Sequence, residues 1–483
     1  MIQGAANLGE RLIEACGRSG IAPALVGADE TIDYRSFANS AGETAESLRK
    51  ARIEADEPVL LAVSNRVRDL AGLCGIWLAG GVAVPVHRTS LEATVAALAR
   101  RTGARLLVNM HPDRAVPASL AADTPVTSRG VPPPPRPLLA GAAYILFTSG
   151  STGEPKGVVL AHDRFSRKLD MIDAALAFVA GERTLLPLQL TFIFGHWVSL
   201  LILLRGGTLE LCEKFEAPVA LEHLAGTRVR RVALVPTMLR ALLPVAEARA
   251  GARYSGAIMV GGEPLPAALG RRYRALWPAA ALGDIYGLTE TGSCDFFLPP
   301  EEYDEAAGSI GRPGPGIEFR LSPGDGELQI RTPTAMRGYL DAPEPTAAAF
   351  DEGWFRTGDL ARSRADGRVE LVGRAKDLIF RGGNKISPLE LERVFAEHPE
   401  VAGALAVGAP DALKGEALHL LIVPREGARL DQARLIDWAR ERLERFKLPD
   451  HIHFAAELPL GRSGKADRAT LRQLIQAKTP PGR

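Results

Sequence analysis

The chain of 483 residues contains few cysteines and almost no net charge. Its four cysteines, at positions 16, 74, 212 and 294, form no close pair and no metal-binding spacing, so the sequence predicts neither a disulfide framework nor a cysteine metal site. This cysteine usage indicates a reducing compartment. The formal net charge of +1 gives no electrostatic support for binding nucleic acid or an anionic membrane.

The chain also lacks a long apolar run. The first residues, "MIQGAANLGERLIEA", have no apolar core and do not resemble a signal peptide. The longest uncharged stretch, residues 70–86, is interrupted by glycines and ends in Pro-Val, and it predicts a buried helix that leads into a buried strand. We therefore expect a cytoplasmic protein without a membrane span.

Apolar runs alternate with segments of helical period through most of the chain. Strand-like runs at residues 58–64, 81–87 and 104–109 are separated by helix-like segments, which indicates an α/β architecture with largely parallel sheets. From about Gly308 the pattern changes to short strands and turns, typical of an antiparallel, barrel-like subdomain. The sequence thus predicts a large N-terminal domain of stacked α/β subdomains plus this β-rich subdomain.

A small α+β domain is expected after a boundary near Arg374. A helix–strand pattern resumes at "SPLELERVFAEHP", where Ser387 occupies an N-cap position directly before Pro388. A chain of this length exceeds what a single core usually holds, so two or more domains are expected.

The stretch "TSGSTGEPKG", residues 148–157, combines Ser/Thr hydroxyls, bare glycine backbone and one lysine. Such a loop offers N–H and O–H donors and a positive charge, which suits phosphate oxygens; a flexible surface turn is the alternative. The apolar runs at 143–147 and 158–162 favour a clamp held by a sheet. The spacing from Gly150 does not match the Walker pattern, so another architecture must hold any nucleotide.

Five stretches in this order resemble the adenylate-forming superfamily, which includes acyl-CoA synthetases, peptide-synthetase adenylation domains and firefly luciferase. The resemblance covers nearly the whole chain. These stretches are "TSGSTGEPKG" (148–157), "DIYGLTETG" (284–292), "GWFRTGDLA" (353–361), "GRAKDLIFRGGNKISPLELE" (373–392) and "LPLGRSGKADRATLRQL" (458–474). Weaker support comes from "GGEPLP" (261–266), "GSIGRP" (308–313) and residues 326–350.

The resemblance implies a reaction in two steps. A carboxylate attacks the α-phosphate of ATP to give an acyl-adenylate, and a thiol of CoA or of a carrier's phosphopantetheine then displaces AMP. The residues that the resemblance assigns to ATP and AMP are Thr148, Ser149, Gly150, Ser151, Thr152, Gly153, Lys156, Gly262, Glu263, Pro264, Asp284, Ile285, Tyr286, Thr289, Asp359, Arg374 and Lys465.

Individual roles follow from the matching motifs. Glu290 corresponds to a magnesium carboxylate, a hard oxygen ligand that suits Mg²⁺, although alone it would be read as a solvated charge. Tyr286 offers a flat face to adenine, and Asp359 would accept hydrogen bonds from the ribose, with a turn-capping role as the alternative. Lys465 corresponds to the lysine placed between the substrate carboxylate and the α-phosphate. Thr148, Glu290 and Lys465 are the expected catalytic residues.

Lys465 would have to leave before a thiol could enter, and the family solves this by rotating the C-terminal domain. Lys376 matches the hinge position, while Gly382 and Gly383 would flank a pantetheine channel. The expected boundaries are residues 1–373 for the N-terminal domain, 374–377 for the hinge and 378–483 for the C-terminal lid domain, which carries Lys465.

The predicted acyl pocket contains Phe192, Ile193, His196, Gly261 and Gly283. Where amino-acid-activating relatives have an aspartate for the substrate ammonium, our alignment places Ile193, so an aromatic or other apolar acid without an α-amine is expected. His196 either binds a substrate hydroxyl or is a core histidine. No carrier domain follows Lys465, so the acceptor is expected to be separate: free CoA first, a stand-alone carrier protein second. A non-catalytic nucleotide-binding relative is a further alternative, which the presence of Lys465, Glu290 and Asp359 together disfavours.

Overall fold

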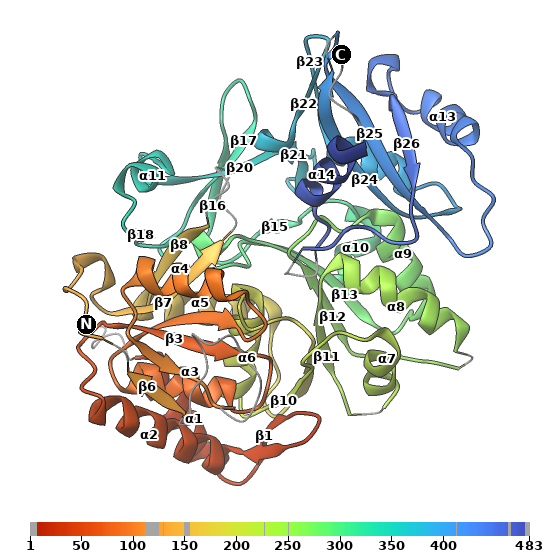
Figure 1. Cartoon of the computed structure of the whole chain (residues 1–483). Coiled ribbons are helices and arrows are strands. Elements are labelled where there is room, and N and C mark those ends of the chain that lie inside the picture. Colours follow the sequence, from red (N-terminus) through yellow and green to blue (C-terminus); the bar gives the residue numbers. More distant parts are fainter. Residues whose placement is uncertain are drawn as a thin grey trace.

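The computed structural model in Figure 1 describes residues 7–111, 125–128, 130–148, 155–226, 228–249, 251–411, 413–461 and 465–478. Its buried hydrophobic residues form separate clusters before and after residues 374–378. The larger, N-terminal part contains three sheets, and the smaller, C-terminal part is built on a fourth sheet, in blue in Figure 1. In the described part of the chain, no helix is long and apolar enough to cross a membrane.

The first sheet follows the order β18-β8-β7-β4-β3-β5-β6. Its pairs β3–β4, β3–β5 and β4–β7 are parallel, while β6, β8 and β18 pair antiparallel toward the edges. The bounds are β3 Pro58–Val63, β4 Val82–His87, β5 Leu106–Val108, β6 Val126–Ser128, β7 Ala142–Thr148, β8 Lys156–Ala161 and β18 Gly338–Tyr339.

The second sheet follows the order β15-β14-β13-β12-β11-β9-β10-β1-β2. All pairs from β13 to β1 are parallel, which places the carboxyl ends of β12 and β13 side by side. The bounds are β1 Pro23–Val26, β2 Thr31–Asp33, β9 Arg183–Leu186, β10 Thr208–Leu211, β11 Arg231–Leu234, β12 Ala257–Gly261, β13 Ala281–Tyr286, β14 Phe296–Leu298 and β15 Arg312–Pro313.

The third sheet is the antiparallel, β-rich subdomain that the sequence predicts after Gly308, and the fourth belongs to the C-terminal part, where β26 pairs parallel with β25. The third sheet contains β16 Glu318–Leu321, β17 Glu327–Arg331, β19 Phe350–Asp351, β20 Trp354–Ser363 and β21 Val369–Arg374. The fourth contains β22 Ile379–Arg381, β23 Asn384–Ile386, β24 Val401–Asp411, β25 Gly415–Pro424 and β26 His451–Phe454.

The helices cover these sheets and connect their parallel strands. They are α1 Leu8–Ser19, α2 Tyr34–Lys50, α3 Asp69–Leu78, α4 Glu92–Thr102, α5 His162–Leu176, α6 Ile193–Leu204, α7 Ala217–Ala225, α8 Pro236–Ala248, α9 Ala267–Leu276, α10 Tyr303–Ala306, α11 Pro343–Ala348, α12 Pro388–Ala396, α13 Gln432–Arg440 and α14 Arg468–Lys478. Short 3₁₀ turns are η1 Pro137–Leu139, η2 Thr289–Thr291, η3 Pro300–Glu302, η4 Ala375–Asp377 and η5 Arg445–Lys447.

Two local predictions have different outcomes. The uncharged stretch at 70–86 forms the buried helix α3 and the buried strand β4, as expected, because a helix that is apolar all round must be enclosed. Helix α12 begins at Pro388 with Ser387 at the N-cap position, as predicted, although the Ser387 side chain makes no capping hydrogen bond. The Ser387 hydroxyl lies against Gly373, where an added Cβ would be 2.6 Å from Oγ, and is turned away from the helix.

A buried ion pair ties helix α5 to the segment before β14. Lys168 and Asp295 are 1% and 0% exposed in their side chains, and Lys168 Nζ lies 2.7 Å from Asp295 Oδ1. Thr291 donates a further hydrogen bond to the other Asp295 oxygen. The pair therefore links α5 to the segment before β14, and neither charge has access to water.

We predict that Lys168→Met destabilises the protein by about 3–5 kcal/mol, because it leaves Asp295 buried without a counter-charge. Urea unfolding followed by tryptophan fluorescence measures the loss. The double variant Lys168→Met/Asp295→Asn should recover a large part of it. Arg272→Met removes a half-exposed pair with Glu247 and should cost about 1 kcal/mol or less. Equal losses for the buried and the exposed pair would contradict this account.

Candidate active site

The carboxyl ends of β12 and β13 bring together two segments that the sequence assigns to a nucleotide. Gly262–Pro264 follow β12 directly, and Asp284–Tyr286 form the end of β13, with Gly261 opposite Ile285 in the register. Thr289 lies in η2, just beyond β13. In an open parallel sheet, ligands bind at this edge of the strands. The edge is therefore a candidate nucleotide site.

Tyr286, Asp359 and Arg374 form one hydrogen-bonded group beside this edge. The Tyr286 hydroxyl donates to Asp359 Oδ2 at 2.7 Å, and Arg374 Nε lies 2.8 Å from Asp359 Oδ1. Asp359 and Arg374 face each other as register partners on β20 and β21. Burial raises the pKa of Asp359, and the Arg374 charge opposes this rise. The hydrogen bond from Tyr286 to Asp359 was not foreseen from the sequence.

Asp284 is 5% exposed and lies among apolar neighbours at the end of β13. Burial raises its pKa to about 8, and the hydrogen bond from the Ile285 backbone and the charge of Arg393 only partly oppose this. At neutral pH the carboxyl group is therefore mostly protonated, and it can donate a hydrogen bond as well as accept one.

Glu290, Tyr339 and Lys156 form a second group. Tyr339 donates its hydroxyl proton to Glu290 Oε1 at 3.1 Å, and Lys156 Nζ lies 4.8 Å from the Tyr339 ring centroid. Lys156 pairs with Thr148 at the turn end of the β7–β8 hairpin, so the hydroxyl- and glycine-rich loop begins and ends beside this group. The motifs assign no role to Tyr339, although it lies within residues 326–350, which support the resemblance. Ser149, Gly150, Ser151, Thr152 and Gly153 lie outside the described residues.

Glu290 fits one oxygen ligand of Mg²⁺. Among the described residues, it has no basic side chain within ion-pair distance, and burial raises its pKa, so its carboxylate would gain from a cation. No group of three or more acidic, histidine or cysteine side chains that could hold a metal occurs in the described part of the chain. A metal here would take one carboxylate and complete its shell with water and phosphate oxygens, which Mg²⁺ favours.

Lys465 reaches the same edge from the C-terminal part. A Cβ placed on Gly262 would lie 3.0 Å from Lys465 Cε and 3.1 Å from Nζ, so the lysine side chain lies along this bare backbone. Gly262 has φ +86°, which only glycine adopts without strain. Burial lowers the pKa of Lys465, Glu263 opposes the change, and Arg374 adds to it. The predicted catalytic lysine thus meets the predicted nucleotide residues.

Three predicted residues lie apart from this cluster. Lys376 is exposed in η4, between β21 of the larger part and β22 of the smaller one. Gly382 and Gly383 form the exposed turn between β22 and β23, with φ +54° and +82°. Figure 1 shows β22 and β23 extending away from the larger part. In this arrangement the turn does not contribute to the cluster around Lys465.

The predicted acyl pocket residues lie on one face of the second sheet and at the start of α6. Gly261 faces the Phe194 ring, and Gly283 faces the Phe297 ring, at 3.3 and 2.9 Å from the Cβ that each glycine lacks. Phe192 precedes α6, and Ile193 begins it and is 7% exposed. The rings therefore pack against the glycine backbone, in space that a side chain at position 261 or 283 would need.

His196 is fully buried, and its Nδ1 lies 3.1 Å from the Tyr144 hydroxyl. Burial lowers its pKa to about 3, so the ring is neutral. These contacts favour the core alternative over a contact with substrate.

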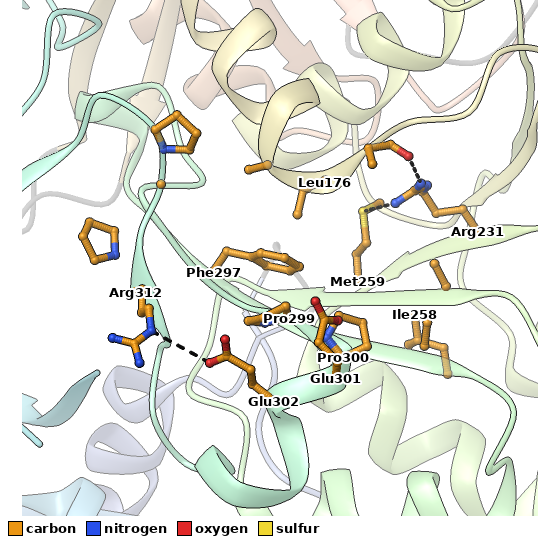
Figure 2. A pocket seen from close by; sticks show the side chains of 18 residues that line it. Leu176, Arg231, Ile258, Met259, Phe297, Pro299, Pro300, Glu301, Glu302 and Arg312 are labelled. Atoms are coloured by element: carbon orange, nitrogen blue, oxygen red, sulfur yellow. Dashed lines mark hydrogen bonds and ion pairs between the residues drawn. The ribbon is translucent and has the colours of Figure 1, made fainter. Parts of the chain in front are cut away.

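A cavity of about 480 Å³ opens on the same sheet and shares Gly283 with the predicted acyl pocket. Figure 2 shows Leu176, Met259 and Phe297 around it. At its rim, Arg312 Nε lies 3.9 Å from Glu302 Oε2. The cavity lies toward the amino-terminal ends of β12 and β13, away from Lys465.

The fold and this site correspond to a known family. Residues 12–340 match the model of the AMP-binding enzyme family, and residues 390–465 match that of the AMP-binding enzyme C-terminal domain. The chain therefore belongs to the AMP-binding, adenylate-forming enzymes and is an AMP-forming acid–thiol ligase. This confirms the resemblance inferred from the motifs.

Individual relatives are CoA ligases. A feruloyl-CoA synthase of Amycolatopsis is 31% identical over 463 residues, which cover 92% of this chain and 94% of the relative. A 2-succinylbenzoate–CoA ligase of Bacillus licheniformis is 28% identical and covers 93% and 96%. The crystal structure of ATP-bound MatB from Rhodopseudomonas palustris is similar with a TM-score of 0.83 and 25% identity, covering 98% of this chain and 99% of MatB. Use of ATP and CoA and an acid–CoA ligase activity follow.

The raised pKa of Asp284 predicts a pH dependence of stability. In the unfolded chain this carboxyl group ionises near pH 4, whereas in the folded protein it ionises at about pH 8, so the folded state resists ionisation. Its contribution to stability is complete below the unfolded pKa and is lost as the pH rises toward about 8. Asp284→Asn should therefore gain stability relative to the unmodified protein between pH 4 and pH 8. Urea unfolding at several pH values measures the difference in unfolding free energy between the variant and the unmodified protein.

The exposed Asp163 provides the control, because Asp163→Asn removes a carboxyl group that is not buried and should change stability far less than Asp284→Asn at pH 8. If the stability difference between Asp284→Asn and the unmodified protein stays constant from pH 4 to pH 8, burial does not raise the pKa of Asp284 as described.

Proposed function

We propose that this enzyme activates an aromatic or other apolar carboxylic acid, one without an α-amine, and transfers it to CoA. The observation that carries the proposal is the position of Lys465, whose side chain lies along Gly262 at the edge that also holds Asp284, Tyr286 and Asp359. A cation at this place is what an attack by a carboxylate on a phosphate requires, because two anions must approach each other.

In the first step a carboxylate oxygen of the acid forms a bond to the α-phosphorus of ATP. The bond from this phosphorus to the bridging oxygen of the β-phosphate breaks, and pyrophosphate leaves with the electron pair. In the second step the CoA sulfur, as thiolate, bonds to the acyl carbon, and the bond from that carbon to the AMP oxygen breaks. A thioester and AMP result.

Each residue group has a distinct part in the proposed first step. Thr148 and Lys156, together with residues 149–153 of the same loop, bind the β- and γ-phosphates, and Lys465 bridges the two reacting anions. Tyr286 contacts adenine, Asp284 and the backbone of Gly262–Pro264 contact its edges, and Asp359 with Arg374 binds the ribose. Glu290 would hold Mg²⁺, which when bound neutralises charge on the phosphate oxygens.

For the second step, we propose that the C-terminal domain rotates about residues 374–377, with Lys376 as the hinge. Rotation withdraws Lys465 and brings the β22–β23 turn, with Gly382 and Gly383, toward the adenylate. A turn of two glycines leaves the narrow pantetheine arm room to pass. The exposed position of Lys376 between β21 and β22 supports this role.

The substrate class rests on the lining of the acyl pocket. Phe192, Ile193 and Phe194 at the start of α6, together with the aromatic rings that pack on Gly261 and Gly283, offer apolar and aromatic surface and no carboxylate for an ammonium group. The relatives reported above support CoA as the acceptor. A stand-alone carrier protein remains the second acceptor to test in the same assays.

We predict that Lys465→Ala lowers adenylate formation by about 10²–10³-fold, the loss expected for one donor that stabilises developing charge. Pyrophosphate exchange with ATP and acid measures this step. Thioester formation from supplied acyl-adenylate should be retained, because the lysine is then withdrawn. Equal losses in both half-reactions would contradict the proposal that the C-terminal domain rotates and withdraws Lys465 before the second step.

The reciprocal variant is Lys376→Pro, in which proline fixes φ at the hinge. Adenylate should form and accumulate while thioester output collapses. Unchanged overall turnover would remove Lys376 from the hinge role.

We predict that 3-phenylpropanoate is activated at least about a hundredfold better than phenylalanine, because an unpaired buried ammonium costs several kcal/mol and about 1.4 kcal/mol is tenfold. Ferulate belongs in the same panel. Pyrophosphate release measures activation, and CoA and a holo carrier protein serve as the two acceptors. Ile193→Asp should narrow the gap by supplying a counter-charge. A preference of the unmodified enzyme for phenylalanine would contradict the proposal that its substrate has no α-amine.

A further inference from the structure

The Glu263 side chain connects the two domains at the point where Lys465 enters the site. The motif match places Glu263 among residues that contact adenine. Its carboxylate instead accepts hydrogen bonds from Thr237, at the start of α8, and from Ala466, in the C-terminal domain. Ala466 follows Lys465 directly in the sequence.

On the N-terminal side, the carboxylate is fixed by two donors of one residue. The Thr237 backbone N–H lies 3.2 Å from Oε2, and the Thr237 hydroxyl lies 3.0 Å from the same oxygen. Arg240 Nη1 donates to the Thr237 hydroxyl oxygen at 3.3 Å, which leaves the hydroxyl proton directed to Glu263. Glu263 is therefore held by a rigid helix end before the C-terminal domain adds any contact.

On the C-terminal side, Glu263 Oε1 accepts the Ala466 backbone N–H at 2.6 Å. Two backbone hydrogen bonds join residues 459–461 to residues 465–467. Gly461 N–H donates to the Lys465 carbonyl and Asp467 N–H donates to the Pro459 carbonyl, both at 2.8 Å. A contact at Ala466 thus fixes the backbone from which the Lys465 side chain extends. Charge acts in the same direction, because the Glu263 carboxylate opposes the loss of the Lys465 proton that burial and Arg374 favour.

We propose that Glu263 is the positioning residue for Lys465: its carboxylate docks the Ala466 backbone on the N-terminal domain and keeps the lysine ammonium charged during adenylate formation. This inference rests on the proposed function of Lys465. The Ala466 contact joins the two domains, so the proposed rotation breaks it. Glu263 should therefore act in the first half-reaction and not in the second.

The charged groups around Lys465 define the expected pH effect. Glu263 and Arg374 act on the charge of Lys465, and Arg240 interacts with both Glu263 and Glu392 of α12. Removing the Glu263 charge lowers the pKa of Lys465 further. The rate of adenylate formation should then fall at a lower pH than in the unmodified enzyme, because the lysine loses its proton earlier.

The test compares Glu263→Ala, Glu263→Gln and the control Glu344→Gln, which changes an exposed carboxylate on α11. Pyrophosphate exchange with ferulate gives kcat and the KM for ATP across pH, and synthetic feruloyl-adenylate with CoA gives the second half-reaction. Hydrogen exchange of the peptide spanning residues 460–468, with AMP present, reports docking without any acid substrate.

Glu263→Ala should lower kcat of exchange by about 10–100-fold, a loss smaller than that of the lysine itself. The KM for ATP should stay within about twofold. Amide exchange at 460–468 should rise, and the second half-reaction should be retained, which also shows that the variant folds. Glu263→Gln keeps an acceptor for Ala466, so amide exchange should stay near the unmodified level while the alkaline limb of the rate profile moves to lower pH.

A raised KM for ATP with unchanged kcat and unchanged amide exchange would overturn the proposal in favour of nucleotide contact alone. Equal losses in both half-reactions would overturn it in favour of general destabilisation. If the unmodified enzyme gives no exchange with ferulate or with 3-phenylpropanoate, the substrate proposal fails, and the hydrogen-exchange comparison still decides whether Glu263 docks the Lys465 segment.

Discussion

The loss of water around charged groups is the constraint on which this site depends. Burial raises the pKa of Asp284, Asp359 and Glu290 and lowers that of Lys465, so each group is pushed toward its neutral form. The neighbours that oppose this are specific: Arg374 for Asp359, and the Tyr339 hydroxyl for Glu290. Because Lys465 and its partner Glu263 come from different domains, the balance of charge is complete only when the domains are docked.

The architecture explains how groups so far apart in sequence meet. The parallel strands β12 and β13 end at one edge, the turn end of the β7–β8 hairpin lies near it, and the antiparallel pair β20–β21 presents Asp359 beside Arg374. Each of these supports is a sheet, so the polar side chains project from backbone that is already held by hydrogen bonds. The C-terminal domain adds the short segment around Lys465, and this domain is the part that the proposed mechanism moves.

The sequence was sufficient for the fold class and for most of the residues that gather at the edge. Periodicity located β3, β4 and α3 because their burial is nearly complete and therefore leaves a clear apolar pattern. Pairings between distant segments were not predictable, since a motif states which residue is present and not what it touches. The contacts of Tyr339 with Glu290 and of Glu263 with Ala466 are of this kind. Ser387 shows the same limit locally, because the sequence places it at the N-cap but does not show that its hydroxyl lies against Gly373.

Gly262 lets the Lys465 side chain approach the backbone closely because glycine has no Cβ. The lysine side chain passes at 3.0–3.1 Å from the point where any other residue would carry Cβ, closer than the usual carbon contact of about 3.5–4.0 Å. At this point the two domains lie so close that there is not enough space between them for one additional methyl group. A substitution there would act on the distance at which the domains can approach, and so on the depth to which the lysine enters, while leaving every charged residue of the site in place.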